Sequence, residues 1–502
     1  MSQEDASSTI HRDASDLDRS MRITLLSYIV KFSTPLLLIL VIRLYGPAAY
    51  GVYGVVATLL NIMMRVCLLG LDKGLLWWIP RQSPGRERVG LLPILALAGA
   101  SSAALALATM GALAPIIARW YGHPEATQSL RWMVATLVVM TIMEVLVQAC
   151  VARRRIEAHV MYKEGVVGQA QCMLALGFYW AGMADIGLEL AFLLSYVLGL
   201  LGVLWVFRSA FRGSPWIGLH ERPRPLLRYS LEIWLTELIS VAMASLDTFL
   251  LAAYTDARTV GMYRAAVQIA QNVLAVRWSF ETLVLAVVAE ISVGNQTRRL
   301  AEGFSRVLML VLSIQAPLVA LLFAITGWIS PLLGDGFSVI HNTTFLLSAV
   351  FLVHGSIGLV SCIIRGYGRT WLSAVDALVA LGVCATVGLL VVPNHGMFGT
   401  AIALGAAYLA LNLLQLIQAR QIVGAWFFTD RLVRFVLVAG VASVAMAATW
   451  WLLVARLGQP TGALDATDAA IRLGSFAVYA AVFGLGWLRM RRQDVPPPVS
   501  PA

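Results

Sequence analysis

Residues 23–42 read ITLLSYIVKFSTPLLLILVI, and residues 50–70 read YGVYGVVATLLNIMMRVCLLG. Each stretch has about the 20 apolar residues that a helix needs to cross a bilayer. The connection between them, RLYGPAA at 43–49, has room only for a short turn. The two stretches therefore predict a pair of membrane-spanning helices, and the same pattern continues to the end of the chain.

The whole chain contains fourteen such apolar segments, of which the last is the shortest. We place them at residues 23–42, 50–70, 91–118, 132–150, 164–184, 187–207, 229–252, 265–289, 307–328, 343–364, 371–391, 397–418, 435–455 and 473–488. This pattern predicts an all-α polytopic membrane protein.

The basic residues between the segments alternate from rich to poor connections. Of the 37 Lys and Arg residues, 27 lie in the two termini and in the connections after even-numbered segments, and seven lie after odd-numbered segments. Cytoplasmic loops attract positive charge, so both termini are expected in the cytoplasm. A wrong segment count would invert this alternation from that point on, so the regular pattern favours fourteen.

The composition excludes several other classes of protein. The chain is 59% hydrophobic and 13% charged, whereas a soluble domain has about 25% charged residues. The net charge of +10 follows from membrane topology, and we expect no nucleic-acid partner. The five cysteines are scattered singly, and no nucleotide or metal motif occurs, so we expect no metal and no cofactor.

The polar segments suggest how the spans are grouped. We expect a cytoplasmic tail at 1–22, an N-lobe at 23–207, a linker at 208–228, a C-lobe at 229–418, two further helices at 435–488 and a tail at 489–502. The predicted fold is two six-helix lobes around a central cavity, with two C-terminal helices beside them.

Two stretches at matching places suggest that the lobes are duplicates. Residues 45–62 read YGPAAYGVYGVVATLLNI and residues 255–272 read TDARTVGMYRAAVQIAQN, and both carry Gly-x-Tyr at the entry to a helix. Because six is even, the copies would share one orientation and be related by an axis along the membrane normal. The stretch 71–90 predicts a short interfacial helix followed by a turn.

Short motifs resemble those of a known family. In the first half they read GP at 46–47, GVY at 51–53, GLDKG at 70–74 and IPR at 79–81, and in the second half DTFLL at 247–251 and VGMY at 260–263. The chain thereby resembles the Wzx-type polysaccharide flippases of the multidrug, oligosaccharidyl-lipid and polysaccharide export superfamily. Tyr45 stands where the family pattern has Leu.

The resemblance implies a function and partners. It implies a flippase for an undecaprenyl-diphosphate-linked oligosaccharide repeat unit in the bacterial inner membrane, working by alternating access. The implied partners are the lipid-linked oligosaccharide, membrane lipids, a polysaccharide polymerase and the export machinery.

Three cations lie within predicted spans: Lys31, Arg65 and Arg277. They lie roughly 12, 8 and 18 Å from the cytoplasmic ends of their helices. An ion at bilayer depth costs at least about 2.5–3.5 kcal/mol, so it must face protein or water. We predict a cationic surface for the pyrophosphate of the substrate, because guanidinium and ammonium groups bind phosphate oxygens. The alternatives are that Arg65 snorkels to the interface and that Arg277 pairs with Glu281, one turn away.

Four acids are candidates for ion coupling or gating: Glu237, Asp247, Glu281 and Asp376. Burial favours the protonated or cation-bound form of a carboxylate. The alternative for Glu237 is a salt bridge to Arg277.

Two further polar residues in predicted spans are assigned structural roles. Glu144 is expected to form a tether to the basic residues at 153–155. We interpret His354 as a hydrogen-bonded packing group.

Three rival functions remain. A multidrug exporter shares the superfamily but usually has twelve helices and an acid-lined cation site. A lipid II-type precursor flippase would also have fourteen helices and a basic cavity. A membrane glycosyltransferase or polysaccharide polymerase generally needs a large periplasmic loop, and the short odd-numbered connections disfavour it.

The predicted topology can be tested with single cysteines in a background that lacks the native ones. Cysteines should react with an impermeant thiol reagent from the periplasm at Gly122, Asp185, Gly334 and Gly396. They should react only after permeabilisation at Gly85, Gly213 and Gly366. Reversed labelling at any of these positions would show that the helix count is wrong there.

Overall fold

The structure is a computed structural model. It describes residues 37–79, 91–120, 126–153, 155–212, 224–277, 280–281, 284, 297–333, 340–367, 369–424, 429–458 and 465–493. Lys31, both terminal tails apart from 489–493, and most of the predicted linker lie outside the described residues.

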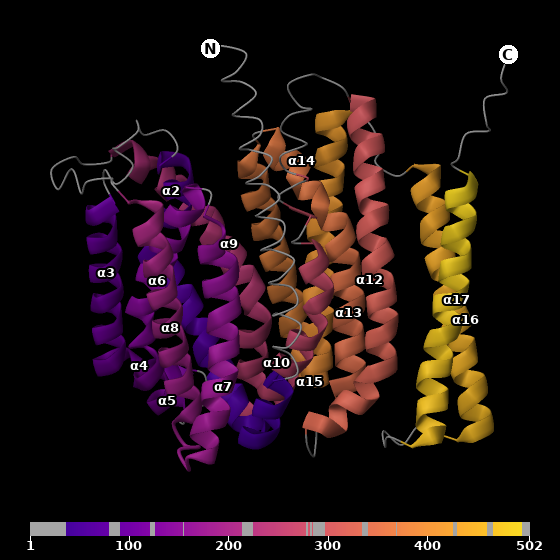
Figure 1. Ribbon diagram of the computed structural model, residues 1–502, viewed down its shortest axis with the longest axis horizontal. Coiled ribbons are helices and arrows are strands. Elements are labelled where there is room, and N and C mark those ends of the chain that lie inside the picture. The colour runs from indigo at the N-terminus through magenta and orange to yellow at the C-terminus, as the bar shows by residue number, and fades with distance from the viewer. Residues whose placement is uncertain are drawn as a thin grey trace. The chain divides into compact units, whose positions relative to one another are not determined.

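Throughout the described residues, the regular secondary structure is helical (Figure 1). The first helix is Leu37–Leu68. It is followed by α2 (Leu71–Trp78), α3 (Leu91–Ala108), the π-helical η2 (Thr109–Leu113), α4 (Ala114–Trp120), α5 (Ala126–Met133), α6 (Thr136–Ala152), the π-helical η3 (Ala158–Val166), α7 (Val167–Trp180), α8 (Gly187–Ala210), α9 (Arg224–Tyr254), α10 (Ala257–Ala270), α12 (Thr297–Leu333), α13 (Ile340–Ile357), the 3₁₀ turn η5 (Gly358–Val360), α14 (Ser361–Gly366), α15 (Thr370–Val423), α16 (Asp430–Leu457) and α17 (Ala466–Gln493).

Each of the fourteen predicted segments overlaps one of these helices. Within the described residues, nine helices are long and apolar enough to cross a membrane, or ten if the bent pair α5–α6 counts as one span. Two of the nine hold two predicted segments each. Leu37–Leu68 contains Gly46 with φ of 82°, and α15 is kinked at Gly396, where φ is 52° and ψ is −130°. The chain is a polytopic all-α membrane protein, as predicted.

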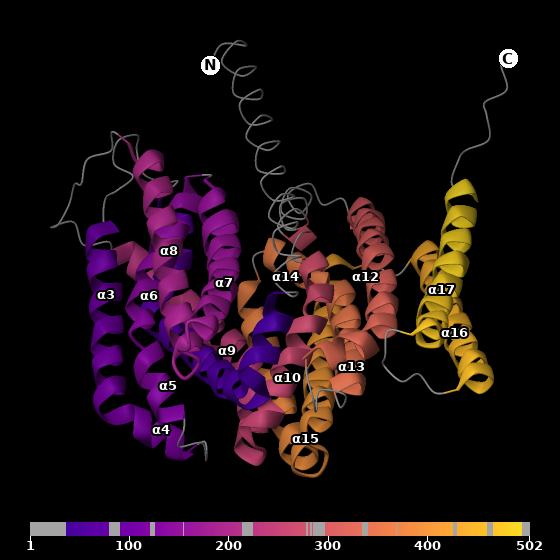
Figure 2. The same cartoon turned by 60° about the horizontal axis from the view of Figure 1, so that its bottom comes forward.

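The chain forms two compact units, Met1–Ser245 with Thr255–Gly261, and Leu246–Tyr254 with Met262–Ala502. In the first unit, α6 packs against α2, α3 and α8, and their apolar side chains form one continuous core. In the second unit, α13 packs between α12 and α15, while α16 and α17 lie side by side as a hairpin (Figures 1 and 2). The lobe boundaries proposed above stay a prediction.

The last helix is longer than the sequence predicted. The predicted segment covers 473–488 and leaves Arg472 in the preceding connection, whereas α17 starts at Ala466. Arg472 is buried, its Nε donates to Asp468 Oδ2 at 2.7 Å, and its guanidinium lies over the rings of Trp328 and Trp450. An arginine with these partners can lie inside the bundle, so it does not mark the end of a helix.

The GLDKG motif shapes the start of α2. Gly70 has φ of 71°, and a Cβ placed there would lie 2.2 Å from the carbonyl oxygen of Ser230 in α9. A Cβ at Gly74 would lie 2.1 Å from Ser230 Oγ. The two glycines thus let α2 pack directly on α9. Leu71 and Leu75 are fully buried, so α2 forms as predicted and packs one face into the protein. Its interfacial position stays a prediction, and the predicted turn after it lies outside the described residues.

Replacing Gly70 by Ala should therefore destabilise the protein, because the change combines a strained φ with a clash against backbone. We expect the melting temperature of the detergent-purified protein to fall by about 4 °C or more. Gly177→Ala is the matched control, because a Cβ there meets nothing within 4 Å. Equal melting temperatures for both variants would contradict this explanation of the motif.

Candidate functional site

Arg65 lies near the end of the first helix, within a group of buried charges. Its Nη1 lies 2.8 Å from Asp72 Oδ2 and 4.0 Å from both Glu144 Oε1 and Glu237 Oε2. Burial raises the pKa of the Asp72 carboxyl above its usual range, although the adjacent Arg65 opposes this. The guanidinium retains 20% exposure, so it is held by protein groups and still reachable.

Glu144 joins this group to a second cation. Its Oε2 lies 2.6 Å from Lys163 Nζ, and its Oε1 accepts a hydrogen bond from Gln148 at 3.1 Å. Helix α6 carries Glu144, and the π-helical η3 carries Lys163. We name the five charged residues Arg65, Asp72, Glu144, Lys163 and Glu237 the Arg65 cluster.

The partners within this cluster differ from those the sequence suggested. Glu144 was expected to pair with the basic residues at 153–155, but the structure pairs it with Lys163 and Arg65. Glu237 had Arg277 as its suggested partner, and its ion pair is with Arg65. Glu237 lies on α9, whose Trp234 also donates from Nε1 to the carbonyl oxygen of Arg65 at 3.0 Å. The N-terminal half of α9 is thus held to the first helix at Arg65.

Arg277 is enclosed by protein groups of the second unit. It is 9% exposed, its Nη1 lies 2.8 Å from His354 Nε2, and its Nε lies 3.7 Å from Glu281 Oε2. Arg365 Nη2 lies 2.5 Å from the other carboxylate oxygen of Glu281. The predicted pair Arg277–Glu281 is present, and Glu281 links it to the more exposed Arg365.

The contacts of His354 fix its protonation state in this arrangement. Arginine can only donate, so His354 Nε2 must accept, and Nδ1 carries the proton. Nδ1 then donates to Asn412 Oδ1 at 3.1 Å, and the ring stacks on Tyr408 at 4.0 Å between centroids. His354 is thus a neutral, hydrogen-bonded packing group that orients Arg277.

Asp247 connects the two parts of the second-half motif. Its Oδ2 accepts from Tyr263 Oη at 2.8 Å, and its Oδ1 accepts from the Thr248 backbone N–H at 2.6 Å. Both side-chain oxygens have donors, which explains why the DTFLL and VGMY motifs occur together.

Asp376 has fewer partners than Asp247. It is fully buried, and its Oδ1 accepts from Gln418 Nε2 at 2.6 Å.

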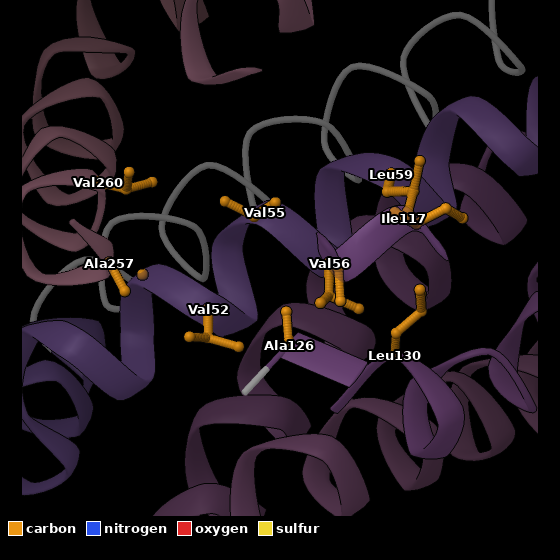
Figure 3. A pocket seen from close by; sticks show the side chains of 11 residues that line it. Val52, Val55, Val56, Leu59, Ile117, Ala126, Leu130, Ala257 and Val260 are labelled. Carbon is orange, nitrogen blue, oxygen red and sulfur yellow. The ribbon is translucent and has the colours of Figure 1, made fainter. Parts of the chain in front are cut away.

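The two Gly-x-Tyr motifs meet face to face. A Cβ on Gly51 would lie 1.8 Å from the carbonyl oxygen of Ala257 and 2.8 Å from Gly261 N. A Cβ on Gly261 would lie 1.8 Å from the carbonyl oxygen of Pro47 and 2.9 Å from Gly51 N. Only glycine allows two backbones to approach this closely. An apolar pocket beside this crossing is lined by side chains from both motifs, including Val52 and Val260 (Figure 3).

This crossing is reciprocal under a single sequence offset. Adding 210 to Pro47 and Gly51 gives Ala257 and Gly261, which are the residues that they contact. The same offset carries Glu144 on α6 to His354 on α13, and each of these contacts an arginine, Arg65 or Arg277. The matching contacts are what a duplicated helical unit would produce.

Three functional candidates were missed by sequence reasoning. Asp72 was treated only as part of a family motif, Lys163 as a loop charge, and Gln418 was not considered. Asp72 had a usable signal, because an acid directly after a helix that carries Arg65 can fold back onto it. The other two pair across 19 and 42 residues of sequence, and no local pattern marks them.

Comparison with known proteins gives a family. The polysaccharide biosynthesis protein family matches residues 40–341, whereas no curated protein matches the chain. Lipid II flippase MurJ in an inward closed conformation superposes with a TM-score of 0.73 at 13% identity, over 94% of this chain and 99% of that chain.

Two further structures share the fold. An inward-facing multidrug resistance MATE family transporter gives a TM-score of 0.61 at 15% identity, over 79% of this chain and 98% of that chain. A transporter of the MOP superfamily from Pyrococcus furiosus gives 0.62 at 14%, over 82% and 96%. At such identities the likeness establishes the fold alone. The family match covers more than half of the chain, and the chain therefore belongs to the polysaccharide biosynthesis protein family.

Proposed function

We propose that the chain is a flippase that moves undecaprenyl-diphosphate-linked oligosaccharide repeat units across the bacterial inner membrane, with both termini in the cytoplasm. A hydroxyl-rich glycan cannot be desolvated in hydrocarbon, so it needs a protein-lined path while the lipid tail stays in the bilayer. The transport makes and breaks no covalent bond. Membership of the polysaccharide biosynthesis family supports this substrate class.

The observation that carries the proposal is the Arg65 cluster. Two basic side chains, Arg65 and Lys163, retain 20% and 24% exposure. Both lie near helix ends that are predicted to be cytoplasmic. Asp72 and Glu144 lie 2.8 Å and 2.6 Å from these cations and orient them. A diphosphate arriving from the cytoplasm would find a guanidinium that can bind its oxygens bidentately.

Glu237 is the acid that the diphosphate would displace. Its carboxylate is 32% exposed and lies 4.0 Å from Arg65, farther than Asp72. When diphosphate binds Arg65, this weaker contact is lost, and with it one link between α9 and the first helix. Substrate binding would in this way loosen the cytoplasmic contact of α9.

Alternating access needs two contacts that open in turn. On the cytoplasmic side, α9 is held to the first helix through Trp234 and Glu237. On the side predicted to be periplasmic, α10 is held to it through the crossing of Gly51 and Gly261. We propose that these contacts open alternately. The proposed cationic surface here is Arg65 with Lys163. The roles predicted for Lys31, which lies outside the described residues, and for Arg277, which is enclosed by His354 and Glu281, stay predictions.

The second candidate is a lipid II-type precursor flippase. The fold is similar to that of the lipid II flippase MurJ, which supports this alternative. A lipid II-type substrate would carry the same diphosphate. The family match favours the polysaccharide substrate. A polysaccharide polymerase and the export machinery are then the proposed partners.

The test uses a strain whose surface polysaccharide depends on this gene. Arg65→Ala should abolish surface polysaccharide at unchanged protein level, and Arg65→Lys should preserve part of it because the charge remains. Arg434→Ala is the control, because Arg434 is an exposed arginine at the start of α16. Normal export by Arg65→Ala would refute the role of the cluster.

A second pair of variants separates the roles of Glu237. If Glu237 only neutralises Arg65, Arg65→Gln with Glu237→Gln should retain more export than Arg65→Gln alone. If Glu237 is instead the coupling acid, Glu237→Gln should remove the dependence of export on an ion gradient. This should hold with either Arg or Gln at position 65.

A further inference from the structure

Among the buried acids that the structure describes, Asp376 is the one with a buried carboxylate oxygen that lacks a hydrogen-bond partner. Asp72, Glu144, Glu157 and Asp468 each pair with a basic side chain. Glu189 accepts from Ser129, and Asp247 accepts hydrogen bonds on both oxygens. Asp376 is 0% exposed and accepts one hydrogen bond, from Gln418. Its Oδ2 is buried and finds no hydrogen-bond partner among the described residues.

Other buried oxygens on α15 also lack a hydrogen-bond partner among the described residues. Gln418 donates its amide N–H to Asp376, which fixes the orientation of the amide and turns Oε1 away from that bond. Buried oxygens without a partner in the described part of the chain also occur at Gln418 Oε1, Gln415 Oε1 and Ser373 Oγ.

The helix geometry brings these four side chains to one place. Ser373 and Asp376 lie one turn apart on the first half of α15, and Gln415 and Gln418 lie one turn apart on the second half. Residues three apart on a helix share a face. The hydrogen bond between Asp376 and Gln418 joins the two faces, so all four oxygens belong to the contact between the two halves of α15.

A buried carboxylate without a basic partner must be neutralised in another way. The unpartnered atoms here are a carboxylate oxygen, two amide oxygens and a hydroxyl oxygen, which are the ligands that hard cations prefer. The set carries one formal negative charge. A monovalent cation neutralises it, whereas a divalent ion would leave a buried positive charge.

We propose that Asp376, Gln415, Gln418 and Ser373 form a binding site for a monovalent cation, with Na⁺ as its ligand, at the cytoplasmic end of the two halves of α15. Bound Na⁺ fastens these halves together and supplies the partner that Asp376 lacks. The binding site is independent of the glycan, because it needs no substrate. Its use in driving transport rests on the proposed function.

Binding is tested on the full-length protein in detergent, titrated with NaCl against choline chloride at constant ionic strength. Na⁺ should raise the melting temperature saturably, since a ligand that binds the folded state stabilises it. Asp376→Asn should raise the apparent dissociation constant by about tenfold or more. Gln415→Leu removes one neutral oxygen and keeps the carboxylate, so it should weaken binding by a smaller factor.

Glu189→Gln is the control, because Glu189 is a buried acid outside the proposed site that accepts a hydrogen bond from Ser129 Oγ. It should keep the Na⁺ response. The proposal is overturned if the wild-type protein shows no Na⁺ response, or if Glu189→Gln loses the response while Asp376→Asn and Gln415→Leu keep it. A melting temperature that follows pH but not Na⁺ would also overturn it, since Asp376 would then be neutralised by a proton.

A transport readout separates this site from the proposed function. If Na⁺ binds as described but polysaccharide export does not need the protein, the flippase assignment fails and the site stands. If export needs the protein and the Na⁺ response is absent, the site fails and the flippase assignment stands.

Discussion

A charge inside a bilayer must have a partner, and this constraint organises the structure. The described spans contain Arg65, Glu144, Arg277 and Arg472, and each is paired at a short distance. Glu144 with Lys163 and Arg277 with His354 join different helices. Arg472, paired with Asp468 on its own helix, also lies over Trp328 of α12. Breaking such a pair by removing one partner is strongly destabilising, whereas an exposed ion pair contributes little.

The pairs differ in how firmly they hold their members. Arg472 and Arg277 are almost fully buried and have several protein partners, so they serve to hold helices together. Arg65 and Lys163 remain partly exposed, so their partners can be exchanged for an incoming anion. This difference in exposure separates the candidate binding site from the structural ion pairs.

Close backbone contact at glycines is a second feature of the structure, and it occurs at two places. Gly70 and Gly74 let α9 pack closely where α2 begins, and Gly51 packs against Gly261 of α10. The offset of 210 residues makes the latter contact reciprocal. The Gly51–Gly261 contact involves backbone atoms and no charged side chain, so it can separate without leaving a charge unpaired.

Much of the fold could be predicted from the sequence, because the bilayer demands long apolar helices and cytoplasmic loops attract positive charge. Gly46 and Gly396, which have positive φ, lie in the predicted connections between segments 23–42 and 50–70 and between segments 371–391 and 397–418. The apolar pattern does not predict the first turn of α17, because Asp468 and Arg472 are polar and their pairing is visible only in the structure. The partners of Glu144 and Glu237 were also missed, since Arg65 and Glu237 lie 172 residues apart and nothing local pairs them.

The central claim is that the crossing of Gly51 and Gly261 must open for substrate to move. Val52→Cys with Val260→Cys, in a background without native cysteines, places two thiols on the pocket beside this crossing (Figure 3). Val52→Cys with Ile117→Cys is the control, because both positions line the same pocket but neither lies on α10.

The measurement is the flipping of undecaprenyl-diphosphate-linked oligosaccharide in proteoliposomes, before and after a short bis-methanethiosulfonate cross-link. The account predicts that cross-linking Val52→Cys to Val260→Cys stops flipping, that a reductant restores it, and that the control pair flips throughout. Undiminished flipping by fully cross-linked Val52→Cys, Val260→Cys protein would contradict the account.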